Sequence, residues 1–200
     1  MVSMIKPTPK AVLATLLTTG LAVVAVATSV QANTAPAAVP MATATAITAA
    51  PFPTLQCGAP STNAIGFTPA LTLVTQSTLV DRTTAYRNCT ASSVPAIHSG
   101  YEHRSFTIPD DCVIMLTATG NANFTITWNN SQTSNLFVSR SATLSGNTLT
   151  VVYTGTVNAG LFLGRSVRQI FKADATELNQ CLAGTGQVPF LIHDVTLTIF

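Results

Sequence analysis

The chain has 200 residues, of which 47% are hydrophobic and only 8% are charged, with 9 basic and 7 acidic side chains. A sparse and nearly balanced charge offers no electrostatic footprint for nucleic acid and no polybasic segment for an anionic membrane surface. We therefore expect no nucleic-acid partner.

The first 32 residues have the pattern of a secretory signal peptide. Lys6 and Lys10 form a basic region, an apolar run continues to Val30, and Val30 and Ala32 supply the small residues of a cleavage site. We expect cleavage after Ala32, which leaves seven basic against seven acidic residues in a secreted, extracellular chain without integral membrane association. The alternative is an uncleaved anchor, because about 20 apolar residues can span a bilayer.

Residues 33–54 consist almost entirely of Ala, Thr and Pro. Such a segment has too little bulky apolar surface to offset the entropy lost on ordering, and its prolines interrupt regular structure. We expect a disordered spacer here and a single domain over residues 55–200, which is a usual domain size.

Four cysteines lie at positions 57, 89, 112 and 181, and no two of them form a CxxC pair. Zinc ribbons and thioredoxin-type sites need that spacing. An even number of cysteines in an exported chain indicates two disulfides, for which three pairings are open from sequence alone. We favour Cys89–Cys112, which would close a hairpin-sized loop, and Cys57–Cys181, which would join the first and last parts of the domain.

From Gly66 onward the sequence has the alternation and turn punctuation of β-strands. Strands are predicted at 70–80, 101–107, 112–119, 121–130, 135–143, 148–157 and 195–200, with hairpin tips at 145–147 and 158–160. Within 121–130, Phe124, Ile126 and Trp128 share one strand face. Because three large apolar side chains on one face are typical of a core, we expect the only tryptophan to be buried rather than to face a ligand.

One short helix is predicted near 175–182. Asp174 followed by Glu177 makes a capping-box pattern, and Gly184 can end the turn. Roughly eight or nine strands with one short helix predict an all-β domain. Its architecture would be either an antiparallel β-sandwich or a small closed β-barrel, which periodicity does not separate.

The densest polar cluster supplies the candidate catalytic or metal-binding residues. His98, Glu102 and His103 could bind a metal or act in acid–base chemistry, and His193 and Asp194 could join them in space. Their spacing matches no established ligand motif, and a strand at 101–107 would place Glu102 and His103 on opposite faces. The competing interpretation is a solvated loop that leads into an edge strand.

Other catalytic motifs are missing from the sequence. There is no GxSxG elbow, and Gly184-Thr185-Gly186 lacks the lysine of a phosphate loop. Asp110 and Asp111 are adjacent, and a turn before Cys112 accounts for them. We therefore assign no catalytic residue, no cofactor and no metal.

Three stretches carry a family resemblance: ITWNNSQTS at 126–134, GLFLGRSVRQIF at 160–171, and LNQCLAGTG at 178–186 with the ending VTLTIF. On these, the chain resembles small secreted β-rich proteins of actinobacteria that have no known function, over about residues 66–200. Members usually have glycine where this chain has Ser131, which questions the exact turn there. The resemblance implies secretion and a β fold, and it implies no catalytic residues.

The leading functional hypothesis is a non-enzymatic extracellular domain with a structural or binding role. Its threonine-rich strand faces could contact cell-wall or other polysaccharides, whereas nothing in the sequence indicates an oligomeric state. A small secreted hydrolase that uses His98, Glu102 and His103 is one alternative. The other is a carrier of a small apolar ligand, because a barrel of this strand number can hold one.

Overall fold

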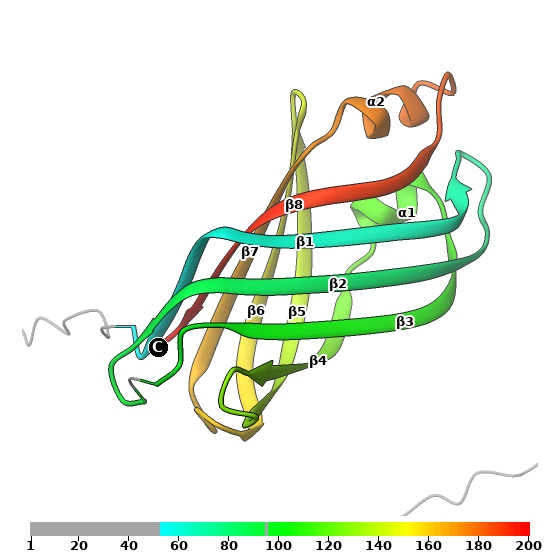
Figure 1. Cartoon of the computed structure of the whole chain (residues 1–200). Helices are drawn as coiled ribbons and strands as arrows, with labels where there is room; N and C mark the ends of the chain where they lie inside the picture. Colours follow the sequence, from blue (N-terminus) through cyan, green and yellow to red (C-terminus); the bar gives the residue numbers. More distant parts are fainter. Residues whose placement is uncertain (1–52, 95) are drawn as a thin grey trace, which may run out of the picture. The chain divides into compact units, whose positions relative to one another are not determined.

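Eight antiparallel strands form a closed barrel, in which each strand pairs with its neighbours in the chain and the last strand pairs with the first (Figure 1). A computed structural model of the chain describes residues 53–94 and 96–200. The predicted signal peptide, 1–32, and the predicted spacer up to residue 52 lie outside the described residues. The all-β prediction is confirmed, and of the two architectures the closed barrel is the correct one.

The elements follow the chain as β1 (Leu55–Leu71), β2 (Gln76–Ala91), β3 (Gly100–Asp110), α1 (Cys112–Thr117), β4 (Gly120–Trp128), β5 (Thr133–Ser145), β6 (Thr148–Gly160), β7 (Ser166–Asp174), α2 (Thr176–Leu182) and β8 (Val188–Ile199). The barrel closes through pairing of β1 with β8, from Leu55 opposite Ile199 to Leu71 opposite Val188.

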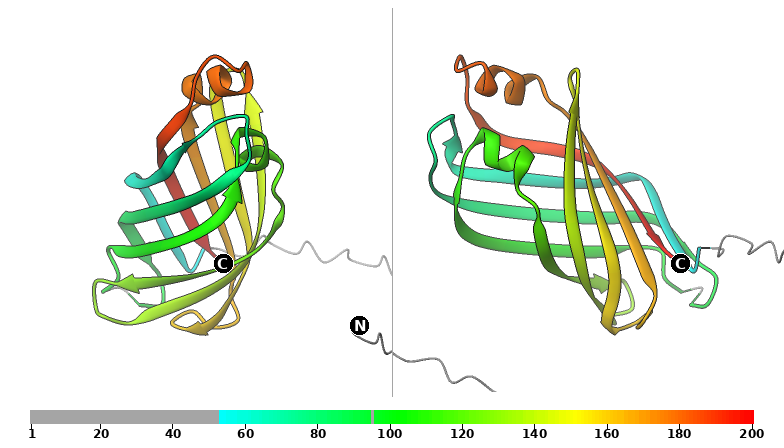
Figure 2. Two further views of the ribbon diagram at one scale, coloured as in Figure 1. Left: turned by 90° about the vertical axis from the view of Figure 1, so that its right-hand side faces the viewer. Right: turned by 180° about the vertical axis from the view of Figure 1, so that it is seen from behind.

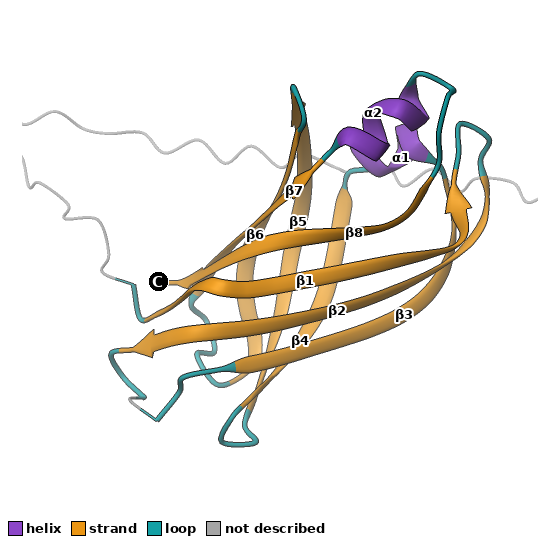
Figure 3. Cartoon of the chain, turned by 45° about the horizontal axis from the view of Figure 1, so that its top comes forward, coloured by secondary structure: helices purple, strands orange, loops and turns teal. Residues whose placement is uncertain are grey.

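Because successive strands alternate in direction, the connections gather at two ends of the barrel (Figure 2). At one end, here called the helical end, lie both helices, the β1–β2 loop and the β5–β6 turn. Figure 3 shows the two helices side by side there. The opposite end, here called the tryptophan end, contains the turn after Trp128, the start of β1 and the end of β8.

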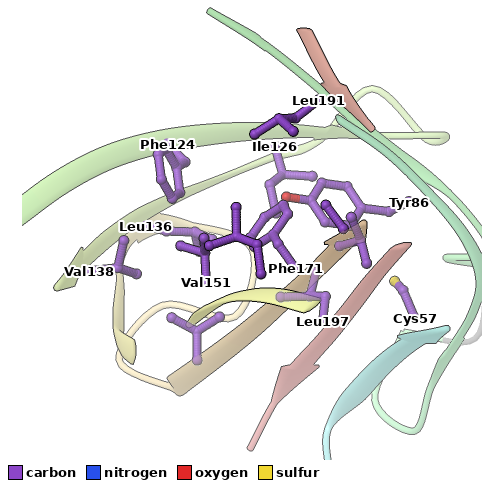
Figure 4. Packing of buried hydrophobic residues seen from close by; sticks show 14 of the residues in the cluster. Cys57, Tyr86, Phe124, Ile126, Leu136, Val138, Val151, Phe171, Leu191 and Leu197 are labelled. Carbon is purple, nitrogen blue, oxygen red and sulfur yellow. The ribbon is translucent and has the colours of Figure 1, made fainter. Parts of the chain in front are cut away.

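The tryptophan end is filled by a packed core, as predicted for Trp128, which is 2% exposed. The indole Nε1 donates a hydrogen bond of 2.8 Å to Ser134 Oγ, and its ring meets Phe162 edge-on at 5.9 Å between centroids. Tyr86 lies behind it at 6.4 Å. Figure 4 shows how Tyr86, Ile126 and Leu136 converge on the barrel axis from different strands.

Side chains alternate between the inside and the outside of the barrel, as the second half of β8 illustrates. Val195, Leu197 and Ile199 are buried inside the barrel, whereas Thr196 is exposed on the outside. This is the two-residue period of a strand with one face on a core.

The predicted disulfide pairing was wrong: the bonds are Cys57–Cys89 and Cys112–Cys181. Cys57 and Cys89 lie on neighbouring strands β1 and β2 near the tryptophan end, and Cys112 and Cys181 join α1 to α2 at the helical end. Between Cys89 and Cys112 the chain crosses the whole barrel as the 11-residue strand β3. An 11-residue strand spans roughly 33 Å, far beyond disulfide reach.

Residues 112–117 form a helix, so the predicted strand at 112–119 was wrong. Asp111 caps this helix, because its Oδ1 accepts hydrogen bonds from the amides of Val113 at 2.8 Å and Ile114 at 2.7 Å. The Thr75 hydroxyl donates to the other carboxylate oxygen. These hydrogen bonds, the one from Thr75 foremost, hold the pKa of Asp111 below its ordinary value.

Other predicted boundaries were partly correct. The helix near 175–182 is confirmed as α2, although Asp174 acts only by accepting a 2.9 Å hydrogen bond from the Thr176 amide. The hairpin tip at 145–147 is confirmed, but 158–160 still belongs to β6, and 70–80 contains the β1–β2 loop.

Ser131 has a φ of 66°, in the left-handed region that favours glycine.

Candidate functional site

The half of the barrel toward the helical end contains a cavity of about 240 Å³. Its wall combines aliphatic and aromatic side chains that point inward from strands on all sides and from α1. They include Phe67, Phe106, Met115, Val151, Tyr153 and Phe171. A mostly apolar cavity in the mouth of a β-barrel is a common setting for a small-molecule site.

The cavity opens where β3 and β4 separate. These strands pair only at Gly100–Trp128 and Tyr101–Thr127, near the tryptophan end. Farther along they diverge, as the right-hand view of Figure 2 shows, and α1 connects them. The cavity wall includes exposed residues from both sides of this opening, Ile108 on β3 and Asn121 on β4.

Two arginines share one carboxylate at the floor of the cavity. Glu102 is 1% exposed, and its Oε2 lies 3.4 Å from Arg82 Nη2 while its Oε1 lies 3.7 Å from Arg104 Nε. Neither contact forms a hydrogen bond, and Nε and Nη2 of Arg82 have no hydrogen-bond partner among the described residues. Burial, and then the neighbouring Arg82 charge, lower the pKa of Arg104.

Aromatic rings hold both guanidinium groups in place. The Arg82 guanidinium carbon lies 4.4 Å from the centroid of Phe124 and 5.1 Å from that of Phe171. The guanidinium carbon of Arg104 lies 4.7 Å from the centroid of the same Phe124 ring. Its Nη1 also donates a 2.6 Å hydrogen bond to Asn123 O. Cation–π contact of this kind stabilises a desolvated arginine without using its N–H donors.

Arg140, a third arginine of the cavity wall, is bound to α1. Its Nη1 donates to Ala118 O at 2.7 Å, and its Nη2 donates to Met115 O. Carbonyl groups at the end of a helix lack partners within the helix, so a cation there is favourable. Nearby, Asp110 is buried, and this burial raises the pKa of its carboxyl.

His193 joins the same polar floor from β8. Its Nδ1 lies 3.0 Å from Asn63 Nδ2, which donates the hydrogen bond, so we assign the ring proton to Nε2. The Thr84 hydroxyl lies 2.9 Å from both Asn63 Oδ1 and Glu102 Oε2 and can donate to one of them. Burial lowers the pKa of His193 to about 4, and the Arg82 charge acts in the same direction.

The depressed pKa of His193 predicts a loss of stability in mild acid. The unfolded chain binds a proton on this histidine near pH 6.5, whereas the folded chain binds it only near pH 4. The unfolded state therefore holds more protons between these values, and stability falls as the pH falls through them. We expect His193 to contribute about 3 kcal/mol to this loss.

Urea unfolding at pH 7 and at pH 4 would measure this effect. His193→Gln should remove that share of the acid sensitivity, and His103→Gln, which changes a histidine on the outer surface, should retain it. Equal acid sensitivity in wild type and His193→Gln would contradict the prediction.

The candidate residues from the sequence are divided between the two faces of the barrel. Glu102 and His193 lie inside, while His98, His103 and Asp194 are exposed on the outside. The expectation that Glu102 and His103 would face opposite ways is confirmed, and the idea that all five residues could meet is wrong. His103 instead lies 3.9 Å from Asp81 and 3.1 Å from Thr83 on the outer surface.

The sequence analysis did not identify Arg82, although a signal was present. Val80, Arg82, Thr84 and Tyr86 alternate along β2, so an arginine occupies a position on the same face as a valine and a tyrosine. A charged residue on an apolar strand face is a candidate for a buried site. Arg104 gave a weaker signal, because one of its two neighbours on the same strand face, Glu102, is also charged.

Within residues 53–94 and 96–200, no group of three or more His, Cys, Asp or Glu side chains is arranged to hold a metal ion. In the same part of the chain, no helix has the length and hydropathy needed to cross a membrane. Comparison of the chain with protein-family models, with curated proteins and with solved structures finds no match.

Proposed function

We propose that this chain is a secreted binding protein that holds a small, mainly apolar molecule inside its barrel. The observation that carries the proposal is the cavity of about 240 Å³ at the helical end. A cavity of about 150 Å³ lined by Leu, Ile and Phe is large enough to bind benzene, so this space can take a somewhat larger molecule.

The fold supports such a role because its two ends differ. The tryptophan end is closed by packed side chains, whereas the opening between β3 and β4 gives access to the cavity without unfolding the barrel. Eight-stranded barrels have an interior wide enough for one small ligand.

Placement outside the cell is part of the proposal. Two disulfides are typical of proteins from oxidising compartments, and they support export of the chain. A signal peptide cleaved after Ala32 stays a prediction.

The other hypotheses have less support. A hydrolase centred on His98, Glu102 and His103 would need side chains that lie on opposite sides of the barrel wall. The polysaccharide hypothesis rests on threonine-rich strand faces, and Trp128, which is buried in the core, adds no aromatic ring to them. The cavity, by contrast, combines an apolar wall with a few polar side chains in one space.

Ligand titration monitored by methyl chemical shifts would test the proposal, with 1-decanol as a neutral apolar probe. Ala122 lies on β4 in the cavity wall, so Ala122→Phe should fill part of the cavity. We expect this variant to bind decanol about tenfold more weakly. The added ring takes space from the decanol chain, and each methylene group that is no longer buried loses a sizeable fraction of a kcal/mol of binding free energy.

Ala64→Phe is the matched control, because it adds the same group to an exposed position on the outer face of β1. It should bind decanol as wild type does. Absence of saturable decanol binding to wild type, or equal affinity in Ala122→Phe, would overturn the proposal.

A further inference from the structure

A buried cation with unused hydrogen-bond donors faces the cavity. Arg82 is 3% exposed and contributes to the cavity wall, yet two of its guanidinium nitrogens, Nε and Nη2, have no hydrogen-bond partner among the described residues. Burying a charge without hydrogen bonds is costly, so such a group binds an incoming acceptor strongly.

The charges around the cavity do not balance. At the floor of the cavity two arginines, Arg82 and Arg104, have one carboxylate between them, that of Glu102, so one positive charge remains in this cluster. Arg140 already donates to the carbonyl groups of α1, and the hydrogen bond from Asn63 fits an uncharged His193. The surplus therefore lies at Arg82 and Arg104, which share Glu102.

We infer that the ligand is a monocarboxylate with an apolar tail, and that its carboxylate binds Arg82 and Arg104 while its tail occupies the cavity. This inference rests on the proposed function. The volume of about 240 Å³ is roughly one and a half times that of a benzene-binding cavity, which suits a tail of about eight to ten carbons.

The geometry of Arg82 favours this headgroup. The Phe124 and Phe171 rings contact its guanidinium, and Nε and Nη2 in the guanidinium plane have no hydrogen-bond partner among the described residues. A planar guanidinium matches a carboxylate through two parallel hydrogen bonds. One surplus positive charge matches a singly charged headgroup, whereas a phosphate monoester would bring a second negative charge.

Isothermal titration with decanoate and 1-decanol would test the inference at neutral pH, because the two probes share the tail and differ in the headgroup. We expect wild type to bind decanoate more tightly than decanol. Arg82→Met should weaken decanoate binding by about tenfold to a hundredfold, the range for hydrogen bonds to a charged group, and leave decanol binding nearly unchanged.

Arg168→Met is the matched control, because Arg168 is exposed on the outer face of β7. It should bind both probes as wild type does. If Arg82→Met does not fold because Glu102 loses a partner, Arg82→Lys keeps a positive charge beside Glu102 but removes the planar pair of N–H donors, and it should show the same selective loss of decanoate binding.

The outcomes separate the two proposals. If wild type binds decanol at least as tightly as decanoate, or if the Arg82 variants retain wild-type decanoate affinity, the carboxylate inference is overturned and the apolar cavity site stands. If wild type binds neither probe, the proposed function fails and the inference fails with it.

Discussion

Replacing Glu102 with leucine is expected to lower the free energy of unfolding by about 3–5 kcal/mol, the range measured when one partner of a buried ion pair is removed. Glu102 lies between Arg82 and Arg104 and is 1% exposed. Without it, two guanidinium groups of like charge remain close together inside the barrel. Urea unfolding of Glu102→Leu beside wild type would measure the loss.

Glu177→Leu is the control for this prediction, because Glu177 is the other glutamate of the chain and is exposed in the first turn of α2. It should cost no more than about 1 kcal/mol. In the Glu102→Leu background, Arg82→Met should restore part of the lost stability. A loss below about 1 kcal/mol in Glu102→Leu would show that the arginines do not depend on this carboxylate.

Removal of the Cys112–Cys181 disulfide is expected to lower the free energy of unfolding by about 4 kcal/mol, because the bond restricts a long loop in the unfolded chain. Its two cysteines are 69 positions apart. The bond also joins α1 to α2 at the helical end, so Cys112→Ala/Cys181→Ala should expose α1 to proteolysis before the rest of the barrel. Urea unfolding and limited proteolysis would measure both effects.

Cys57→Ala/Cys89→Ala provides the comparison. Its cysteines are 32 positions apart, so a slightly smaller loss is expected, without early cleavage of α1. Peptide mapping without reduction should recover Cys57 linked to Cys89 and Cys112 linked to Cys181. Recovery of Cys89 linked to Cys112 would contradict the arrangement described above.

Together, these predictions connect stability with ligand binding at one set of residues. Arg82 and Arg104 are held by Glu102 and by aromatic rings, yet their donors are incompletely used. Groups with unmet hydrogen-bonding capacity inside a protein are frequent at functional sites. The missing hydrogen bonds of these arginines limit stability, and they would favour binding of a carboxylate.

Local patterns along the chain predicted much of the fold. The alternation of Val195, Leu197 and Ile199 with threonines is a two-residue period, and it identifies a strand with one buried face before any partner strand is known. The same period correctly placed Trp128 in the core and separated Glu102 from His103. Near 175–182, the helix was also found from short-range signals.

Where a segment can form either a helix or a strand, its contacts with the rest of the chain decide which one forms. Residues 112–117, CVIMLT, are rich enough in strand-forming residues to resemble a strand. They form a helix because Asp111, which accepts a hydrogen bond from the Thr75 hydroxyl, caps its first turn. Thr75 comes from the β1–β2 loop, 36 positions away along the chain. A contact of that range leaves no mark in the local sequence pattern.

By itself, the sequence determined the strand faces, the buried tryptophan, the short helix near 175–182 and the presence of two disulfides, because each depends on neighbouring residues or on cysteine number. Only the tertiary structure decided barrel over sandwich, the disulfide pairing, and the meeting of Arg82, Glu102 and His193 around one cavity. The physical reason is that these features depend on which strands become neighbours. That choice is made by packing of the whole chain and not by the period of any one strand.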